Sequence, residues 1–159
     1  METMALDSTA VIQFIKYGLA GGVATITHIV IFHLIAWKIF PALQDKDHAV
    51  QFFNLTIKKV TDATRARNSM ISNFIAFLIA NMVAYITNIL WVFEGGKYPF
   101  YVEIILFYCV SGISVFLGTM LMGILIKRFG ILTTYAFASN IITAVMINYA
   151  MRKFFIFQG

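Results

Sequence analysis

Residues 72–93 of this chain form the stretch SNFIAFLIANMVAYITNILWVF, which contains no charged side chain. The uncharged run begins earlier, at Asn68, and covers 26 residues up to Phe93. A helix needs about 20 predominantly apolar residues to cross the hydrocarbon core of a bilayer. Because an unpaired backbone amide is costly in lipid, a helix is the economical structure for such a run. This segment therefore predicts a membrane-spanning helix.

Three further stretches lack Asp, Glu, Lys and Arg over a similar length. They are residues 17–37, 104–126 and 129–151, with 21, 23 and 23 residues. Together the four runs predict an all-α integral membrane protein with four transmembrane helices. The alternative is that one of the outer segments is re-entrant.

Composition agrees with a membrane protein. Of the residues, 60% are hydrophobic and 12% are charged, and the mean hydropathy is +0.84. A soluble domain is about 45–50% apolar and about 25% charged. The net charge of +5 is scattered over loops, which suits anionic membrane lipids better than nucleic acid. Residues 1–9 contain no basic residue, so we expect no cleavable signal peptide.

The connection over residues 41–67 is long, polar and basic. Its apolar residues recur at helical spacing, at Val50, Phe53, Ile57 and Val60. Polar residues follow the same spacing on another face, at Gln51, Asn54, Lys58, Asp62 and Arg65. This pattern predicts an amphipathic helix at the level of the lipid headgroups. A solvated loop is the alternative.

The chain contains an apparent repeat of one helical hairpin. Tyr85-x-x-Asn88 and the residues up to Gly95 resemble the segment from Tyr149 to Gly159, at an offset of 64 residues. The hairpin starts also resemble each other, at Tyr17 and Tyr108, with an offset of 91 residues. The difference between the offsets equals the length of segment 41–67, which marks that segment as an insertion.

This repeat organises the chain as a single membrane domain, residues 1–159. Repeat 1 covers about 14–95 with the insertion, and repeat 2 covers about 104–159. Both termini are then expected on one side of the membrane. In transporters, polar sites lie where such repeats meet. The alternative is duplication of a purely structural hairpin.

Several of these motifs resemble the GtrA-like family of small four-span membrane proteins. Residues 14–22, FIKYGLAGG, are similar to its opening motif. Its second helix tends to end Tyr/Phe-x-x-Asn-Arg-x-Trp-Val-Phe, which this chain follows from Tyr85 to Phe93 except for Ile89 in place of the basic residue. The motif recurs around Asn148, Arg152 and Lys153.

The resemblance implies a role in cell-envelope polysaccharide modification at the cytoplasmic (inner) membrane. Members are thought to move, or flip, a polyprenyl-phosphate-linked monosaccharide across the membrane, with membrane glycosyltransferases as partners. The alternative within the family is a scaffold that recruits a glycosyltransferase without transporting. The resemblance also implies that both termini are cytoplasmic, and neither an enzymatic activity nor a cofactor is expected.

Polar residues in the apolar runs suit such a substrate, which carries one phosphodiester charge, sugar hydroxyls and a long apolar tail. Moving its head requires neutral hydrogen-bonding groups inside the membrane and cations near an interface. The candidate lipid-phosphate and sugar-binding residues are Lys16, Asn81, Asn88, Asn148, Arg152 and Lys153. The alternatives are interhelical hydrogen bonding for each Asn and snorkelling to the headgroups for each cation.

Other function classes fit less well. His28 and His33 are five residues apart and do not share a helix face, so we expect no metal site. No nucleophile–base pair is visible. A proton-coupled small-molecule exporter usually needs a carboxylate within the membrane, whereas Glu103 lies only at the edge of the third run.

Assembly and orientation are predicted from small and basic residues. Gly18-x-x-x-Gly22 and Ser114-x-x-x-Gly118 allow close helix approach, and we expect a homodimer or a complex with a glycosyltransferase. The two connections on one side carry eight basic residues with their flanks, and the termini with the central turn carry four. The positive-inside rule would therefore place the termini outside, against the family resemblance.

Overall fold

The computed structural model describes residues 8–92 and 99–151, and every element within them is a helix. The elements are α1 (Ser8–Lys38), α2 (His48–Phe53), α3 (Asp62–Thr87), the π-helix η1 (Asn88–Val92), α4 (Phe100–Phe129) and α5 (Thr133–Met151). The prediction of an all-helical protein is confirmed for this part of the chain.

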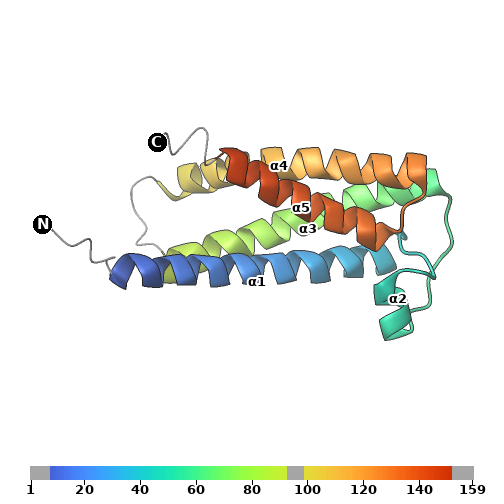
Figure 1. Ribbon diagram of the computed structural model, residues 1–159, viewed down its shortest axis with the longest axis horizontal. Coiled ribbons are helices and arrows are strands. Elements are labelled where there is room, and N and C mark those ends of the chain that lie inside the picture. Colours follow the sequence, from blue (N-terminus) through green and yellow to red (C-terminus); the bar gives the residue numbers. More distant parts are fainter. Residues whose placement is uncertain (1–7, 93–98, 152–159) are drawn as a thin grey trace, which may run out of the picture.

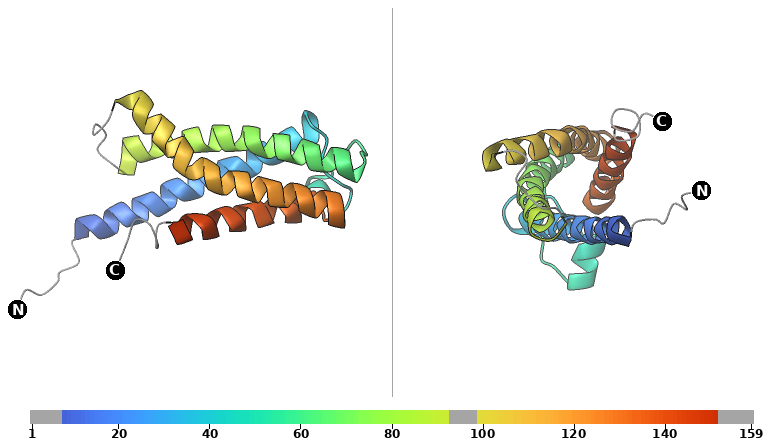
Figure 2. Two further views of the ribbon diagram at one scale, coloured as in Figure 1. Left: turned by 90° about the horizontal axis from the view of Figure 1, so that it is seen from above. Right: turned by 90° about the vertical axis from the view of Figure 1, so that its left-hand side faces the viewer.

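The four long helices form an antiparallel bundle (Figure 1). Helix α3 packs between α1 and α4, and α5 packs on the other side of α4. Figure 2 shows these helices around a common axis, in the order α1, α3, α4, α5. The start of α1 and the end of α5 lie at one end of the bundle, and α2 lies at the other end (Figure 1).

Three helices are long and apolar enough to cross a membrane, over Ile15–Lys38, Asp62–Trp91 and Phe100–Phe129. They correspond to the first three predicted spans. The fourth predicted span, residues 129–151, forms α5 from Thr133, a helix of 19 residues, but α5 is not among these three. The four-span arrangement is therefore supported for three helices and stays a prediction for α5.

The segment 41–67 differs from the amphipathic helix that we predicted. Its only separate helix is the six-residue α2, which ends at Phe53 because the next residue, Asn54, adopts a left-handed conformation with φ 53°. Residues 55–61 are not helical, so Ile57 and Val60 do not continue the apolar face of Val50. Helix α3 then begins at Asp62, where the Thr61 side chain accepts a hydrogen bond from the Thr64 amide.

A buried polar cluster, here called the connector cluster, ties this segment to the bundle and consists of Asp47, Arg65 and Thr133, all 0% exposed. The Arg65 Nη1 donates to the Ile131 carbonyl at 2.7 Å and to Thr133 Oγ1 at 3.2 Å. The Thr133 hydroxyl in turn donates to the Ala42 carbonyl. Our assignment of Arg65 to the polar face of an amphipathic helix at the headgroup level is therefore wrong, because its guanidinium is buried against the connection between α4 and α5.

Asp47 completes this cluster at the start of α5. One carboxylate oxygen accepts from the Thr134 amide at 2.9 Å, and the other accepts from the Gln44 amide at 2.6 Å. A helix start leaves backbone amides unpaired and favours negative charge. Asp47 therefore caps α5 from a segment far away in the sequence, which fixes the long connection against the helix.

The apolar core lies near the same end of the bundle. The rings of Phe32 on α1 and Phe137 on α5 stack with a centroid distance of 3.8 Å, within a cluster that also contains Ala36, Met122 and Ile126. Large apolar side chains also cover the outside of the bundle. Examples are Ile26 on α1 and Phe116 on α4, 64% and 62% exposed, as expected for surfaces that face lipid.

The glycine motifs have different environments. A Cβ added to Gly18 or Gly22 would meet no atom within 4 Å, so that motif makes no close contact within the described chain. In contrast, a Cβ on Gly118 would lie 2.9 Å from the Asn140 carbonyl oxygen and would also meet the Asn140 side chain. Gly118 thus permits the close approach of α4 to α5.

Replacing Gly118 by alanine is expected to destabilise the bundle by about 1–3 kcal/mol, because a backbone oxygen cannot move aside cheaply. Thermal unfolding in detergent measures this loss. Gly112→Ala is the matched control on the same helix, since a Cβ there would meet no described atom within 4 Å. Equal melting temperatures for the two variants would show that the α4–α5 contact is looser than described.

Candidate functional site

Helix α3 carries a row of buried polar side chains along the face that it turns toward its neighbours. Apart from Arg65, its buried polar residues are Asn68, Ser69, Ser72, Asn73 and Asn81, and Asn88 follows at the start of η1. The spacing from Ser69 to Asn73, Asn81 and Asn88 keeps these residues close to one helix face. We call the row Ser69, Ser72, Asn73, Asn81 and Asn88 the α3 polar strip.

A hydrogen-bond network at Asn73 joins all four long helices in the middle of this strip. Asn73 Oδ1 lies 2.9 Å from His28 Nε2 on α1 and accepts from Asn140 Nδ2 on α5 at 3.1 Å. Its Nδ2 donates to the Thr119 hydroxyl on α4. Since Asn73 and Asn140 are 0% and 1% exposed, this network is a buried polar layer inside an apolar bundle.

Aromatic rings pack against the network on the side that faces α2. The His28 ring meets the edge of Phe137 at a centroid distance of 5.3 Å, and Phe137 also contacts His33 at 5.7 Å. The His33 ring bonds the Ile29 carbonyl of its own helix at 2.8 Å. The polar layer is therefore bounded by packed rings between α1 and α5.

On the other side of the network, the strip continues toward the end of the bundle where α1 begins. Asn81 Oδ1 accepts a hydrogen bond from Ser111 on α4 at 3.0 Å. Asn88 donates from Nδ2 to the Ala84 carbonyl of its own helix at 2.7 Å. Asn88 also opens the π-helix η1, a wide turn of the kind that recurs at functional sites.

Several buried atoms of this region have no hydrogen-bond partner within the described part of the chain. They are Ser69 Oγ, Ser72 Oγ, Asn81 Nδ2, Asn88 Oδ1 and Asn140 Oδ1. Buried polar groups in native proteins are almost always paired, and each exception calls for an explanation. Four of these five atoms belong to the α3 polar strip, so the strip offers hydrogen-bonding capacity that the described residues do not use.

The structure describes only some of the predicted site residues. Asn81 and Asn88 are both 7% exposed and lie on the strip. Lys16 is half-buried in the first part of α1, and Asn148 lies near the end of α5. These positions fall near the start of α1, after the end of α3 and near the end of α5, and these helix ends lie toward the same end of the bundle (Figure 1). Arg152 and Lys153 lie outside the described residues, so their role as phosphate contacts is untested.

Sequence reasoning missed His28, Asn73 and Thr119. Asn73 could have been found, because it precedes Asn81 by eight residues and so lies on nearly the same helix face. His28 gave no local signal, since its partner is 45 residues away in the chain. Within residues 8–92 and 99–151, no group of three or more His, Cys, Asp and Glu side chains is arranged to hold a metal ion.

Comparison with known protein families gives one match. A family model described as GtrA/DPMS, transmembrane domain, matches residues 49–157, which is more than half of the chain. Searches of the curated proteins and of the solved structures give no match. The matched segment contains α3, η1, α4 and α5, and thus the whole α3 polar strip.

Proposed function

Because the chain belongs to the GtrA/DPMS transmembrane-domain family, we propose that it flips a polyprenyl-phosphate-linked monosaccharide across the membrane. The transfer would serve cell-envelope glycosylation. Family membership supports an involvement with lipid-linked sugars, and the α3 polar strip supports movement of the sugar head in particular.

The single observation that carries this proposal is the set of unpaired buried atoms on the strip. A sugar head offers several hydroxyls, each of which can donate and accept a hydrogen bond. Asn81 Nδ2 and Asn88 Oδ1 provide one free donor and one free acceptor among the described residues, about two helical turns apart. Neutral amides can bind such hydroxyls within lipid without the large cost of burying a charge.

The rest of the substrate has different requirements. The polyprenyl tail can remain in lipid along the apolar outer surface of the bundle, where side chains such as Ile26 and Phe116 are exposed. The phosphate needs cations close to the membrane surface. We propose that Lys16, Arg152 and Lys153 provide them, and that Asn148 also lines the path of the head.

In this proposal, the hydrogen-bond network at Asn73 opens when the sugar head passes. His28, Asn73, Thr119 and Asn140 close the middle of the bundle by bonding to one another. A head that passes this layer must replace those bonds with bonds to its own hydroxyls. The hydrogen bonds that break and those that form are both between polar groups of similar kind, so opening the layer has little net free-energy cost. The four residues hold and release the head and do not react with it.

A non-transporting scaffold for a membrane glycosyltransferase is the second candidate. Under both candidates the chain is not itself an enzyme, and a glycosyltransferase and a second copy of the chain are the expected partners. The open face around Gly18 and Gly22 is available for either contact. The scaffold gives no role to the unpaired atoms of the strip, and for this reason we favour transport.

Reconstitution in liposomes with a panel of labelled lipids tests the proposal. The panel contains polyprenyl phosphates carrying different monosaccharides, together with a sugar lipid that lacks the phosphate. Transport predicts that the purified chain moves at least one phosphate-linked sugar and leaves the phosphate-free lipid in place. A scaffold predicts no movement of any lipid, together with a higher activity of the glycosyltransferase when both proteins share one membrane.

We also propose an orientation in the cytoplasmic membrane with both chain ends on the cytoplasmic side. The start of α1 and the end of α5 lie at one end of the bundle (Figure 1). Cysteines introduced at positions 2 and 159, in a Cys109→Ser background, should then resist membrane-impermeant maleimide in intact cells and react after lysis. Labelling of both positions in intact cells would reverse the orientation, and labelling of one alone would exclude an even number of spans.

A further inference from the structure

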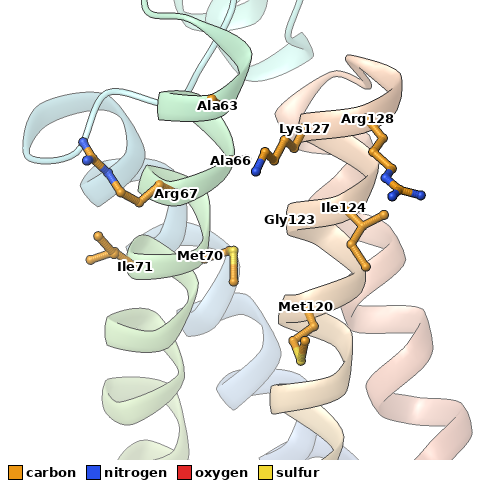
Figure 3. Close-up of a pocket in the computed structure, with 10 residues that line it drawn as sticks. All are labelled: Ala63, Ala66, Arg67, Met70, Ile71, Met120, Gly123, Ile124, Lys127 and Arg128. Atoms are coloured by element: carbon orange, nitrogen blue, oxygen red, sulfur yellow. The ribbon is translucent and has the colours of Figure 1, made fainter.

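A groove between α3 and α4 lies at the end of the bundle that carries α2, away from Lys16 and Asn88. It has a volume of about 600 Å³ and is drawn in Figure 3. Its apolar wall includes Met70 on α3 and Ile124 on α4, with Gly123 between the helices. The Met70 sulfur lies 2.5 Å from where a Cβ on Gly123 would be, so the absence of a side chain at Gly123 lets Met70 pack against α4.

Three basic residues line this groove: Arg67, Lys127 and Arg128. Figure 3 shows Lys127 reaching into the gap between the helices, whereas the charged ends of Arg67 and Arg128 point away from the gap on its two sides. None of the described residues that line the groove is acidic. The groove thus joins three positive charges at the membrane surface to an apolar cleft directed into the bundle.

These cations differ from other basic residues nearby in having no acidic partner among the described residues. Arg65 pairs with Asp62 at 3.0 Å, and Lys59 pairs with Asp45 at 3.3 Å. Within the same part of the chain, Arg67, Lys127 and Arg128 form no ion pair. Lys127 and Arg128 lie in the last turn of α4, where the helix dipole favours cations, but Arg67 lies near the start of α3 and gains nothing from that effect.

The ligand that complements this arrangement has a phosphate at the membrane surface and an apolar chain below it. Arginine binds phosphate through forked hydrogen bonds, and lysine binds it as a point charge. Basic pockets between transmembrane helices are a known kind of site for phosphorylated lipid headgroups.

We propose that this groove is a second docking site for a polyprenyl phosphate, at the opposite end of the bundle from Lys16, with the phosphate bound by Lys127 in the gap and attracted by the positive charges of Arg67 and Arg128 beside it (Figure 3). The identity of the lipid chain rests on the proposed function, whereas the recognition of phosphate rests on the groove alone. The groove borders the α3 polar strip, because Asn73 and Thr119 bond across the same α3–α4 interface further into the bundle. A phosphate docked here places the attached sugar next to the network at Asn73.

Direct binding tests this site. The full chain in mild detergent is titrated with polyprenyl monophosphate, polyprenol and phosphatidylglycerol, and bound lipid is counted by native mass spectrometry. We expect the monophosphate to bind more tightly than either competitor. The triple variant Arg67→Gln, Lys127→Gln, Arg128→Gln should weaken its binding about tenfold or more, as expected for the loss of several charge-assisted hydrogen bonds.

Two further variants separate this site from general charge effects. Lys58→Gln removes one exposed positive charge from the connection between α2 and α3, and Lys58 does not line the groove. This variant should bind lipid as the wild type does. Ile124→Trp keeps all three cations but narrows the apolar cleft, and it should weaken binding of the monophosphate. Ile124→Trp also tests the groove if the triple variant does not fold.

The outcomes are distinct from those of the transport assay. Wild-type affinity in both the triple variant and Ile124→Trp would overturn the site, as would equal binding of polyprenol and polyprenyl phosphate. Equal binding of phosphatidylglycerol would show a general anionic-lipid site and would overturn the assignment of the lipid chain. If the lipid binds as expected but no sugar is moved in liposomes, the docking site stands and the transport proposal fails.

Discussion

Replacing Asn81 and Asn88 together by leucine is expected to reduce transport of the lipid-linked sugar about tenfold or more, while leaving the bundle as stable as before or more stable. Leucine is close to asparagine in size but offers no hydrogen bond. Each asparagine has one buried amide atom without a partner in the described part of the chain. The partners of the two amides also keep other bonds, because the Ser111 hydroxyl still donates to the Phe107 carbonyl at 2.6 Å and the Ala84 carbonyl still accepts from the backbone amide of residue 88. The change therefore leaves no buried partner unpaired, which is the costly case.

This variant is informative because it is expected to lower transport while leaving the stability of the bundle unchanged or higher. If the two amides only join helices, losing the bond from Ser111 to Asn81 should lower stability slightly and leave any transport unchanged. If they bind the sugar head, transport falls because the loss of two hydrogen bonds, each about 1 kcal/mol, raises the barrier to passage. The rate in liposomes and the melting temperature in detergent are measured on the same preparation.

Thr87→Val is the matched control for this pair. Thr87 precedes Asn88, but its hydroxyl already donates to the Val83 carbonyl of its own helix at 2.8 Å. Removing it deletes a polar group from the same turn without removing any unused hydrogen-bond donor. Transport by Thr87→Val should therefore match that of the wild type. A similar loss in this control and in the double variant would point to a general sensitivity of η1.

The second large effect concerns stability and the connector cluster. Arg65→Met should destabilise the folded chain by about 3 kcal/mol or more. The change removes the hydrogen bonds that the buried guanidinium donates to the Ile131 carbonyl, to Thr133 and to Asp62. Hydrogen bonds to charged groups contribute about 1.5–3 kcal/mol each. The Ile131 carbonyl would lose this donor. Unfolding in a denaturing detergent mixture measures the loss.

Arg67→Met is the matched control for Arg65→Met. It lies two residues further along α3 with an exposed side chain, and it forms no ion pair in the described part of the chain. It should leave stability unchanged and should weaken binding of polyprenyl phosphate. Arg65→Lys should be intermediate in stability, because lysine keeps the positive charge but lacks the forked hydrogen-bond donors of the guanidinium. Equal stability of Arg65→Met and Arg67→Met would contradict the described role of the connector cluster.

These two arginines also show what the sequence could predict about this fold. The uncharged runs predicted the positions of the long helices, because the bilayer imposes a minimum length and a low charge on every span. The search for polar residues within these runs selected Asn81 and Asn88, and the structure buries them both. Such features depend on residues close together in the chain.

Features that depend on distant residues were not predictable in the same way. Arg65 fitted the polar face of an amphipathic helix by its spacing, and its burial depends on the carbonyl of Ile131, 66 residues later. Asp47 caps α5 from a distance of 87 residues. The network at Asn73 likewise joins residues from four separate helices. A local pattern carries no information about which helices become neighbours, and this is why the centre of the candidate site was missed.

The central claim is that this chain by itself moves the head of a lipid-linked sugar across a bilayer. The most direct test reconstitutes the purified chain alone in liposomes that contain a labelled polyprenyl-phosphate monosaccharide, and follows access of the head to a membrane-impermeant reagent over time. We predict that the head reaches the reagent from both leaflets, faster than in protein-free liposomes and more slowly with the Asn81→Leu, Asn88→Leu variant. Wild-type and double-variant liposomes that both match the protein-free rate, with folded protein in each, would contradict the account.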